Sequence, residues 1–167
     1  MSMQNDTGRS HDCQLRKRKA VVSRPFHFTW SGLPNVYMTG IEYEECSICG
    51  RVAGIFPMLS GLLDTLTSMV VQKSSPLTPP EIKFLRKAAR KKAADFAKII
   101  GVSAEQVSRW ENGHNPPEKS ADKLIRLVAA GSRKQDMILS LNYRSPGKES
   151  YLLSFRHKKW SGAFSTK

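Results

Sequence analysis

The sequence has little of what marks secreted and membrane proteins. Its 167 residues include three cysteines, an odd number that does not suit a disulfide framework. No apolar run comes close to the ~18 residues that a membrane-spanning helix needs. The stretch from Met1 to Arg18 is polar and lacks the apolar segment of a secretory signal. We therefore expect a cytoplasmic protein with no membrane partner.

Acidic residues are also scarce, and this scarcity indicates a class of partner. Lysine and arginine total 27 against 14 aspartate and glutamate residues, so the formal net charge is +13 and the pI is near 10.0. Excess positive charge concentrates a protein near polyanions. Nucleic acid is the commonest such partner, and an anionic membrane surface or an acidic protein is the alternative. The excess is +2 over residues 1–75, +5 over 76–131 and +6 over 132–167.

Recognisable catalytic motifs are missing as well. We find no Ser-His-Asp grouping, no paired carboxylates in a known pattern, no phosphate-binding loop and no His-Glu-x-x-His. The four histidines are scattered along the chain. An enzyme is therefore the least favoured class, and we expect a binding protein.

The pattern of apolar and polar residues divides the chain into five segments. We predict a basic flexible arm (1–25), a small α+β domain containing a Cys-x-x-Cys pair (26–72), a linker (73–77), a helical domain (78–131) and a basic extension with a hairpin pattern (132–167). In the second segment, apolar residues alternate from Phe26 to Tyr43, which is typical of short antiparallel strands.

Two parts of this division leave alternatives open. Leu59, Leu62, Leu63, Leu66 and Val70 have helical spacing, and this helix either packs on the small sheet or forms a partner or dimer face. The extension suggests strands over 137–143 and 151–155 around a turn at 145–147. Its basic, aromatic end at 156–160 is read as a frayed tail, with contact to DNA backbone as the alternative.

Three capping-box patterns mark helix starts in the helical domain. Thr78 precedes Glu81, Ser103 precedes Gln106, and Asn115 precedes Glu118, each by three residues. At this spacing the side chain of each residue in a pair can accept a hydrogen bond from the backbone N–H of the other. Proline follows the first and third caps directly, at the favoured first helical position. No such cap stands at Lys91-Lys92-Ala93, before the second helix.

Residues 101–112 have the pattern of a helix-turn-helix. Gly101-Val102-Ser103 supplies a left-handed turn residue, an apolar plug and a cap between two helices. With Val107 and Trp110 inward, a small polar set faces outward, and the second helix of such a unit fits the major groove. The candidate base-reading residues are Ala104, Glu105, Ser108 and Arg109. The alternative is a solvated helix face with Glu105 and Arg109 as an ion pair.

Cations and polar groups around this unit are candidates for phosphate contacts. Long cations beside a groove-inserted helix neutralise phosphates and position the helix. The candidate phosphate-binding residues are Lys83, Lys91, Lys92, Ser103, Asn112 and His114. The alternative is a solubilising surface, which is compatible with the same residues.

Two sequence segments resemble the Cro/phage-repressor-type helix-turn-helix family. They are Gly101-Val102-Ser103 and Val107 through Gly113, the second of which is followed by a proline. Further stretches resemble the MqsA/YgiT-type antitoxin family, namely Ser31 through Tyr37, Cys46 to Gly50, Ile55 through Pro57 and Glu81 through Lys87. This resemblance implies a mainly α C-terminal helix-turn-helix domain of four to five helices and a small α+β zinc-finger-like N-terminal domain. It implies a dimeric repressor that binds a double-stranded DNA operator and autoregulates its operon, with a toxin as a plausible partner.

The resemblance also frames a metal hypothesis and a second function. That family has an earlier Cys-x-x-Cys pair, whereas Cys13 is followed here by Gln14-Leu15-Arg16. Cys46, Cys49 and Cys13 with His11 or His27 would complete a four-ligand Zn²⁺ site, and a degenerated, empty site is the alternative. The second function is a protein-interaction module that neutralises a toxin through residues 26–72, with DNA binding secondary.

Overall fold

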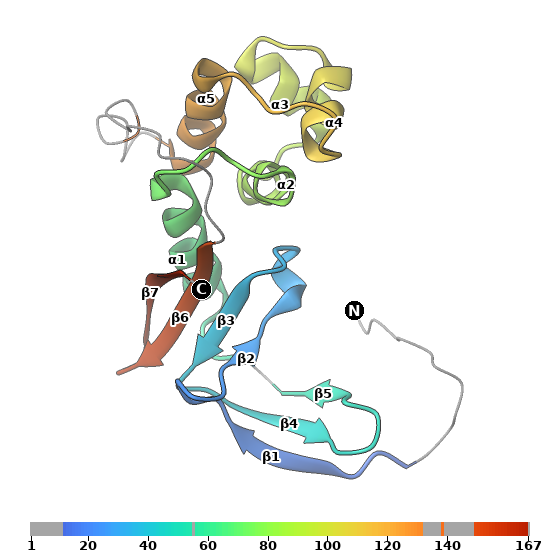
Figure 1. The fold of residues 1–167 in the computed structure, drawn as a ribbon, viewed down its shortest axis with the longest axis vertical. Coiled ribbons are helices and arrows are strands. Elements are labelled where there is room, and N and C mark those ends of the chain that lie inside the picture. Colours follow the sequence, from blue (N-terminus) through green and yellow to red (C-terminus); the bar gives the residue numbers. More distant parts are fainter. Residues whose placement is uncertain (1–11, 55, 132–137, 139–148, 167) are drawn as a thin grey trace.

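A computed structural model describes residues 12–54, 56–131, 138 and 149–166 of this protein. A small antiparallel sheet and a small mixed sheet lie at one end, and a helical domain lies at the other (Figure 1). The strands are β1 (Leu15–Lys19), β2 (Phe26–His27), β3 (Val36–Thr39), β4 (Glu42–Cys46), β5 (Val52–Ala53), β6 (Glu149–Arg156) and β7 (Lys159–Thr166). The helices are η1 (Thr29–Ser31), α1 (Leu59–Gln72), α2 (Pro79–Ala88), α3 (Ala93–Ile100), α4 (Ala104–Glu111) and α5 (Lys119–Ala130).

The first sheet has the order β1-β4-β5, and it replaces the second half of the predicted arm, residues 12–25, by a structure that includes a paired strand; residues 1–11 lie outside the described residues. Strand β1 pairs with β4 along its whole length, with Arg16 opposite Glu45, Lys17 opposite Glu44 and Lys19 opposite Glu42. Opposite charges directly across a strand pair stabilise it. The basic residues of β1 therefore pair with the acidic residues of β4 in one antiparallel ladder, although the two strands are distant in sequence.

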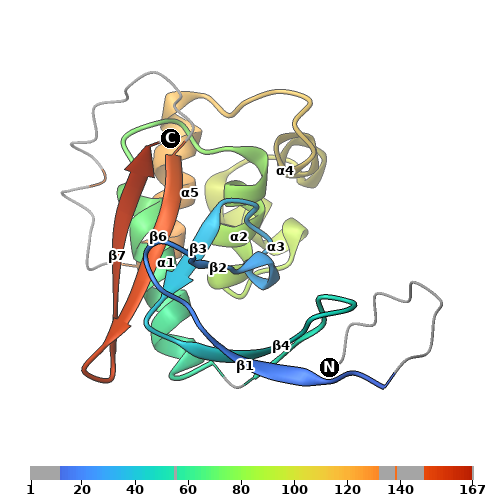
Figure 2. The ribbon, with the colours of Figure 1, turned by 60° about the horizontal axis from the view of Figure 1, so that its bottom comes forward.

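The second sheet joins the two ends of the chain, in the order β2-β3-β6-β7. Strand β6 runs parallel to β3, with Val36 opposite Tyr151, and turns antiparallel into β7 (Figure 2). The turn residues His157 and Lys158 both have positive φ, as a tight two-residue hairpin turn requires. A hairpin is thus present, with its turn at residues 157–158. The prediction of a frayed tail at 156–160 was wrong, because these residues form the hairpin turn and the strand ends beside it. The predicted strand at 137–143 and turn at 145–147 fall outside the described residues, apart from Ile138.

Helix α1 packs over β6 and β7, which favours the packing alternative for the leucine-rich helix (Figure 1). Leu59 and Leu63 remain exposed, and its buried residues are Leu62, Leu66, Met69, Val70 and Val71. Gly162 of β7 lies directly under Met69, and a Cβ at this glycine would collide with the methionine sulfur. The close approach of helix and strand therefore depends on a glycine at this position.

The predicted linker over residues 73–77 is a packed joint. Lys73, Ser75 and Leu77 are all buried. The fully buried Arg126 of α5 donates to the carbonyl oxygens of Val71, Lys73 and Ser75, at 3.0, 2.5 and 2.8 Å. Asp122 is within 2.6 Å of Arg126 Nε and also accepts the backbone N–H of Leu77. The prediction of a solvated linker was wrong because α5, distant in sequence, supplies partners for its backbone.

Glu81 completes this joint from the side of α2. Its carboxylate accepts hydrogen bonds from Lys73 Nζ at 2.6 Å, from the backbone N–H of Thr78 at 2.7 Å, and from the Tyr151 hydroxyl of β6. Burying charged groups is favourable only when they are paired and hydrogen-bonded, and all three partners meet that need. The helical domain and the second sheet are therefore fixed to each other by named buried contacts.

Candidate functional site

The helical domain forms a compact bundle that positions α4 at its surface. The core of this bundle includes Ile82, Leu85, Phe96, Ala97, Val107, Trp110 and Ile125. Helix α3 ends at Gly101, which has φ of +74° and donates its N–H back to α3. Because a left-handed residue ends α3 so abruptly, α4 begins only three residues later in a new direction.

Two of the three predicted caps are confirmed. Thr78 and Glu81 form a capping box at the start of α2, with proline at the first positions. The Ser103 side chain accepts the Gln106 N–H at 3.1 Å and so starts α4. The third prediction was wrong, because α5 begins at Lys119 with Glu118 as its N-cap. Pro117 explains the shift, since a residue that precedes proline is disfavoured in helical conformation.

Helix α4 presents the predicted polar face to solvent. Val107 and Trp110 are 0% and 4% exposed and point into the bundle. Ala104, Glu105, Ser108 and Arg109 are all exposed. The predicted division of inward and outward residues is therefore confirmed as geometry. No ion pair between Glu105 and Arg109 is present among the described residues, so Arg109 is not tied to its own helix by that contact.

An ion pair that sequence reasoning missed anchors α4 to α2. Arg86 donates from Nε and Nη2 to the two carboxylate oxygens of Glu111, at 2.5 and 2.9 Å. A third donor, Nη1, reaches the carbonyl oxygen of Lys91 at 3.0 Å. The hydrogen bond to Glu111 raises the pKa of Arg86 above its ordinary value. Arg86 therefore orients the candidate recognition helix from behind rather than facing outward.

Asn112 is exposed, and its side chain also contacts Ser108. Its side-chain amide donates to the Ser108 carbonyl oxygen at 2.9 Å and to the Ser108 hydroxyl oxygen at 3.2 Å. The other candidate phosphate contacts are exposed; they are Lys83, Lys91, Lys92, Ser103 and His114. Asn112 thus orients the Ser108 side chain. Residues four apart lie on the same side of a helix, so the sequence spacing is consistent with this contact.

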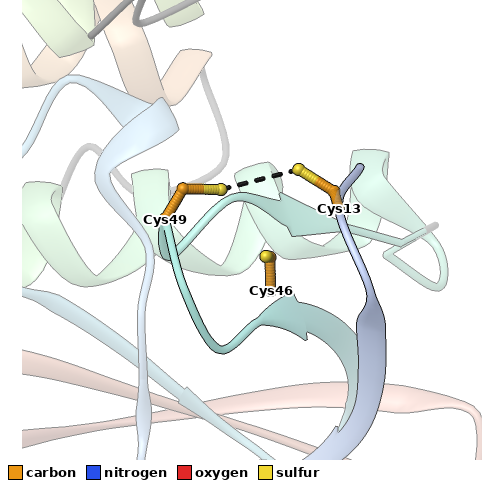
Figure 3. A group of neighbouring side chains, drawn as sticks. All are labelled: Cys13, Cys46 and Cys49. Carbon is orange, nitrogen blue, oxygen red and sulfur yellow. Dashed lines mark hydrogen bonds between the residues drawn. The ribbon is translucent and has the colours of Figure 1, made fainter. Parts of the chain in front are cut away.

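Three cysteines meet at the end of the first sheet (Figure 3). Cys13 precedes β1, Cys46 ends β4, and Cys49 lies in the turn before β5; their sulfur atoms all lie within 4.8 Å of one another. The Cys13 and Cys49 sulfurs are 3.6 Å apart. Two thiolates on one tetrahedral Zn²⁺ with Zn–S near 2.3 Å would be about 3.8 Å apart. The three sulfurs are therefore positioned to bind a metal ion, and the Cys13–Cys49 separation is close to that expected for two thiolates on zinc.

Among the described residues, no histidine lies beside the three cysteines to act as a fourth ligand. His11 lies outside the described residues. His27 donates from Nε2 to the Pro34 carbonyl oxygen at 2.7 Å and stacks on Tyr37, so it is not part of the cysteine cluster. The hydrogen bond with Cys49, followed by burial, raises the pKa of Cys13 to about 11. Binding of a metal ion by Cys13 therefore requires its thiol to lose a proton.

Comparison with known proteins first identifies the class of the helical domain. Residues 82–130 match the helix-turn-helix family HTH_3, which places α2 to α5 in a Cro/C1-type helix-turn-helix domain. The chain is also similar to proteins named "Uncharacterized HTH-type transcriptional regulator YiaG" from Escherichia coli strains K12, O6:H1 and O157:H7. Each is 42% identical over 50 residues, which is 30% of this chain and 52% of the relative.

The family match does not include the two sheets. The chain spans about half the length of the curated relatives it matches. No solved structure matches it significantly. The family match begins at Ile82, so the cysteine cluster and the C-terminal hairpin lie outside it. Of the helices that the structure describes, none has both the length and the apolar composition to cross a membrane.

Proposed function

We propose that this protein is a sequence-specific DNA-binding transcriptional regulator. The observation that carries the proposal is the exposed polar face of α4, held by a buried apolar face in a helix-turn-helix domain. The second helix of such a unit enters the major groove, where base edges can be read. Helix α4 lies at the end of the molecule away from the first sheet, so the sheets leave its outer face open (Figure 1).

We assign base reading to four side chains of this face. Arg109 donates to guanine O6 and N7, Glu105 accepts from cytosine N4, Ser108 contacts a base or a phosphate, and Ala104 makes apolar contact. Ser108 is positioned by Asn112, as described above. The residues that contact phosphates on either side of the groove are Lys83, Lys91, Lys92, Ser103, Asn112 and His114.

Binding to the protein's own upstream DNA tests this function. Fluorescence anisotropy at two salt concentrations should show tighter binding to that region than to a scrambled duplex of equal length. Arg109→Ala should weaken operator binding by about tenfold or more and relax one base position. Arg51→Ala, an exposed arginine on the sheet side, is the matched control and should leave binding unchanged. Equal affinity of the wild type for both duplexes would refute the proposal.

The phosphate contacts have a separate prediction. Replacing Lys91 and Lys92 by alanine should weaken binding to operator and to scrambled DNA equally. Each lost phosphate contact should also lower the salt dependence of binding by about 0.9 in the log–log slope. A variant that loses specificity while keeping the salt slope would place these lysines at base edges instead.

A second function, toxin neutralisation through residues 26–72, is supported by a different observation. This segment exposes several large apolar side chains, namely Trp30, Ile48, Met58, Leu59 and Leu63. Such exposure is typical of protein-binding surfaces when the residues are contiguous. On this reading the protein is an antitoxin that autoregulates its operon as a repressor. Co-expression with a neighbouring small reading frame should rescue growth, and Trp30→Asp should abolish the rescue.

Zinc is part of the proposal for the first sheet. The ion would be held by Cys13, Cys46 and Cys49, with His11 as the proposed fourth ligand. A structural zinc supplies folding free energy by cross-linking its ligands. Here it would join the start of β1 to the turn between β4 and β5, a part of the chain with only a short sheet of its own.

A further inference from the structure

The two sheets have four edge strands among the described residues, and only one of them is both long and nearly free of charge. Strands β2 and β5 have two residues each. Strand β1 has five residues, of which four are lysine or arginine. Short or charged edges resist pairing with other chains. Strand β7 has eight residues and a single charge, at Lys159, so it lacks the features by which proteins protect an edge.

The outer edge of β7 offers a row of backbone groups for pairing. Across the two-residue turn, Arg156 and Lys159 form the closing pair, so hydrogen-bonded pairs recur at Ser161 and Ala163. The alternate residues, Trp160, Gly162 and Phe164, direct their N–H and C=O groups away from β6. An independent contact agrees: Tyr151, opposite Phe164, donates its N–H to the Asn35 carbonyl oxygen, away from β7. No strand among the described residues pairs with this outer edge.

Charge distribution indicates which partner fits. The chain carries +13, so two copies repel each other across most of their surfaces. The face made by α1 and β7 is different, because Asp64 is the only charge between Met58 and Val71 and no charge occurs between Trp160 and Thr166. A groove of about 420 Å³ lies between the two elements, lined by Asp64, Thr65, Ser68, Met69, Gln72, Gly162 and Phe164. This face is where a second copy can approach without repulsion.

We propose that two copies of this chain associate by antiparallel pairing of their β7 strands. A strand that pairs antiparallel with its own copy obeys two-fold symmetry, and each copy then contributes the same patch. The pairing satisfies the outward groups of Trp160, Gly162 and Phe164 and extends the four-stranded sheet across both copies. It also supplies the two-fold partner that the proposed reading of DNA half-sites needs, but it does not depend on DNA.

Hydrogen exchange on the wild-type protein tests the pairing at single amides. The N–H groups of Gly162 and Phe164 should become protected from exchange when the protein concentration is raised. The N–H of Ala163 bonds to β6 in the monomer as well, so its protection should depend much less on concentration and serves as the internal control. Equal, low protection of Gly162 and Phe164 at all concentrations would overturn the proposal.

Charge substitutions then identify the occupant as a second copy. The exposed side chains of Ser161 and Ser165 lie on the face of β7 opposite Met69 and do not touch the α1 packing. Light-scattering mass measurements without DNA should give twice 18.7 kDa for the wild type and 18.7 kDa for S161K/S165K. The S161E/S165E variant should also be monomeric, and mixing the two variants should restore the dimer. The control S23K/S120K adds the same charge at exposed serines outside α1 and β7 and should remain dimeric.

The outcomes separate this inference from the DNA-binding function. A monomeric wild type, or an S161K/S165K variant that remains dimeric, would overturn the pairing. A dimer that pairs as described but does not distinguish operator from scrambled DNA would refute only the proposed function. A monomeric wild type that pairs through β7 only with a different protein would assign the edge to that protein and also overturn the proposal.

Discussion

Arg86 on α2 binds both carboxylate oxygens of Glu111 on α4, at N···O distances of 2.5 and 2.9 Å. The side chains are 13% and 9% exposed, so the pair is largely shielded from water. Bidentate pairing fixes orientation as well as distance. Because Glu111 follows Trp110 directly, this contact sets the rotation of the helix whose outer face carries Arg109.

A double-mutant cycle measures the coupling of this pair. Arg86→Gln and Glu111→Gln should each lower the free energy of unfolding, and the cycle should give a coupling of about 1–3 kcal/mol. Both variants should also weaken operator binding, although neither side chain faces DNA. Urea denaturation and anisotropy give the two readouts. The exposed neighbour Lys87 provides the control Lys87→Gln, which should leave stability unchanged. Strictly additive effects would show that the two side chains act separately.

The hydroxyl of Tyr151 has a pH-dependent role in the joint. Burial, followed by the charge of Glu81, raises the pKa of Tyr151 above its ordinary value of 10.0. A raised pKa in the folded state means that stability is fully present below the unfolded pKa and is lost as the pH rises above it. The free energy of unfolding of the wild type should therefore fall more steeply above about pH 10 than that of Tyr151→Phe.

The same substitution has an effect at neutral pH. Tyr151→Phe removes a donor to a buried carboxylate, which should cost about 1.5–3 kcal/mol of unfolding free energy. Tyr43→Phe is the matched control, because Tyr43 is also largely buried but has no hydroxyl hydrogen bond in the described part of the chain. Chemical denaturation at pH 7 and pH 11 distinguishes the two variants. An equal loss for both would attribute the effect to the removal of any largely buried tyrosine hydroxyl rather than to its contact with Glu81.

Arg126 should be the most costly single truncation in the joint. Arg126→Met keeps the apolar bulk but leaves the carbonyl oxygens of Val71, Lys73 and Ser75 without their buried donor. It also leaves Asp122 with an uncompensated charge, and breaking a buried pair costs about 3–5 kcal/mol. Lys119→Met on the exposed side of the same helix is the control and should change stability by less than about 0.5 kcal/mol. Thermal unfolding followed by circular dichroism measures both.

Metal binding at the cysteine cluster should depend on pH. Ligand thiols must lose their protons, and the pKa of Cys13 is raised to about 11 without metal. The apparent affinity for Zn²⁺ should therefore increase as the pH rises through the neutral range. Elemental analysis should give one zinc per chain for the wild type and substantially less for Cys13→Ser. Ser47→Ala, within the same turn, is the control. Full zinc content in Cys13→Ser would exclude Cys13 as a ligand.

Local sequence signals predicted the parts of the fold that local interactions determine. Caps at Thr78 and Ser103, the glycine turn at Gly101 and the inward positions of Val107 and Trp110 all depend on neighbours within a few residues. Tertiary pairing determined the rest. The basic run at 16–19 gains its partners from β4, and β6 pairs with β3, more than 100 residues away.

Mispredictions in the helical domain have the same physical origin. The polar segment 73–77 has the composition of a linker, and its burial is favourable because Arg126, Glu81 and Asp122 supply buried partners. The Arg86–Glu111 pair is separated by 25 residues, so no spacing rule signals it. Of the candidate site, the direction of each side chain on α4 was predictable, whereas the contacts that hold α4 in place were not.

The packed joint also limits how a partner could influence the DNA-facing end. Because Arg126 and Glu81 bind the joint through buried charges, the second sheet cannot swing freely relative to α4. A protein bound to the second sheet would be carried at a fixed angle to the duplex. It would act by steric overlap with DNA or with a neighbouring bound molecule. Loosening the two ends instead would require exposing four buried charged side chains, Lys73, Glu81, Asp122 and Arg126, to water.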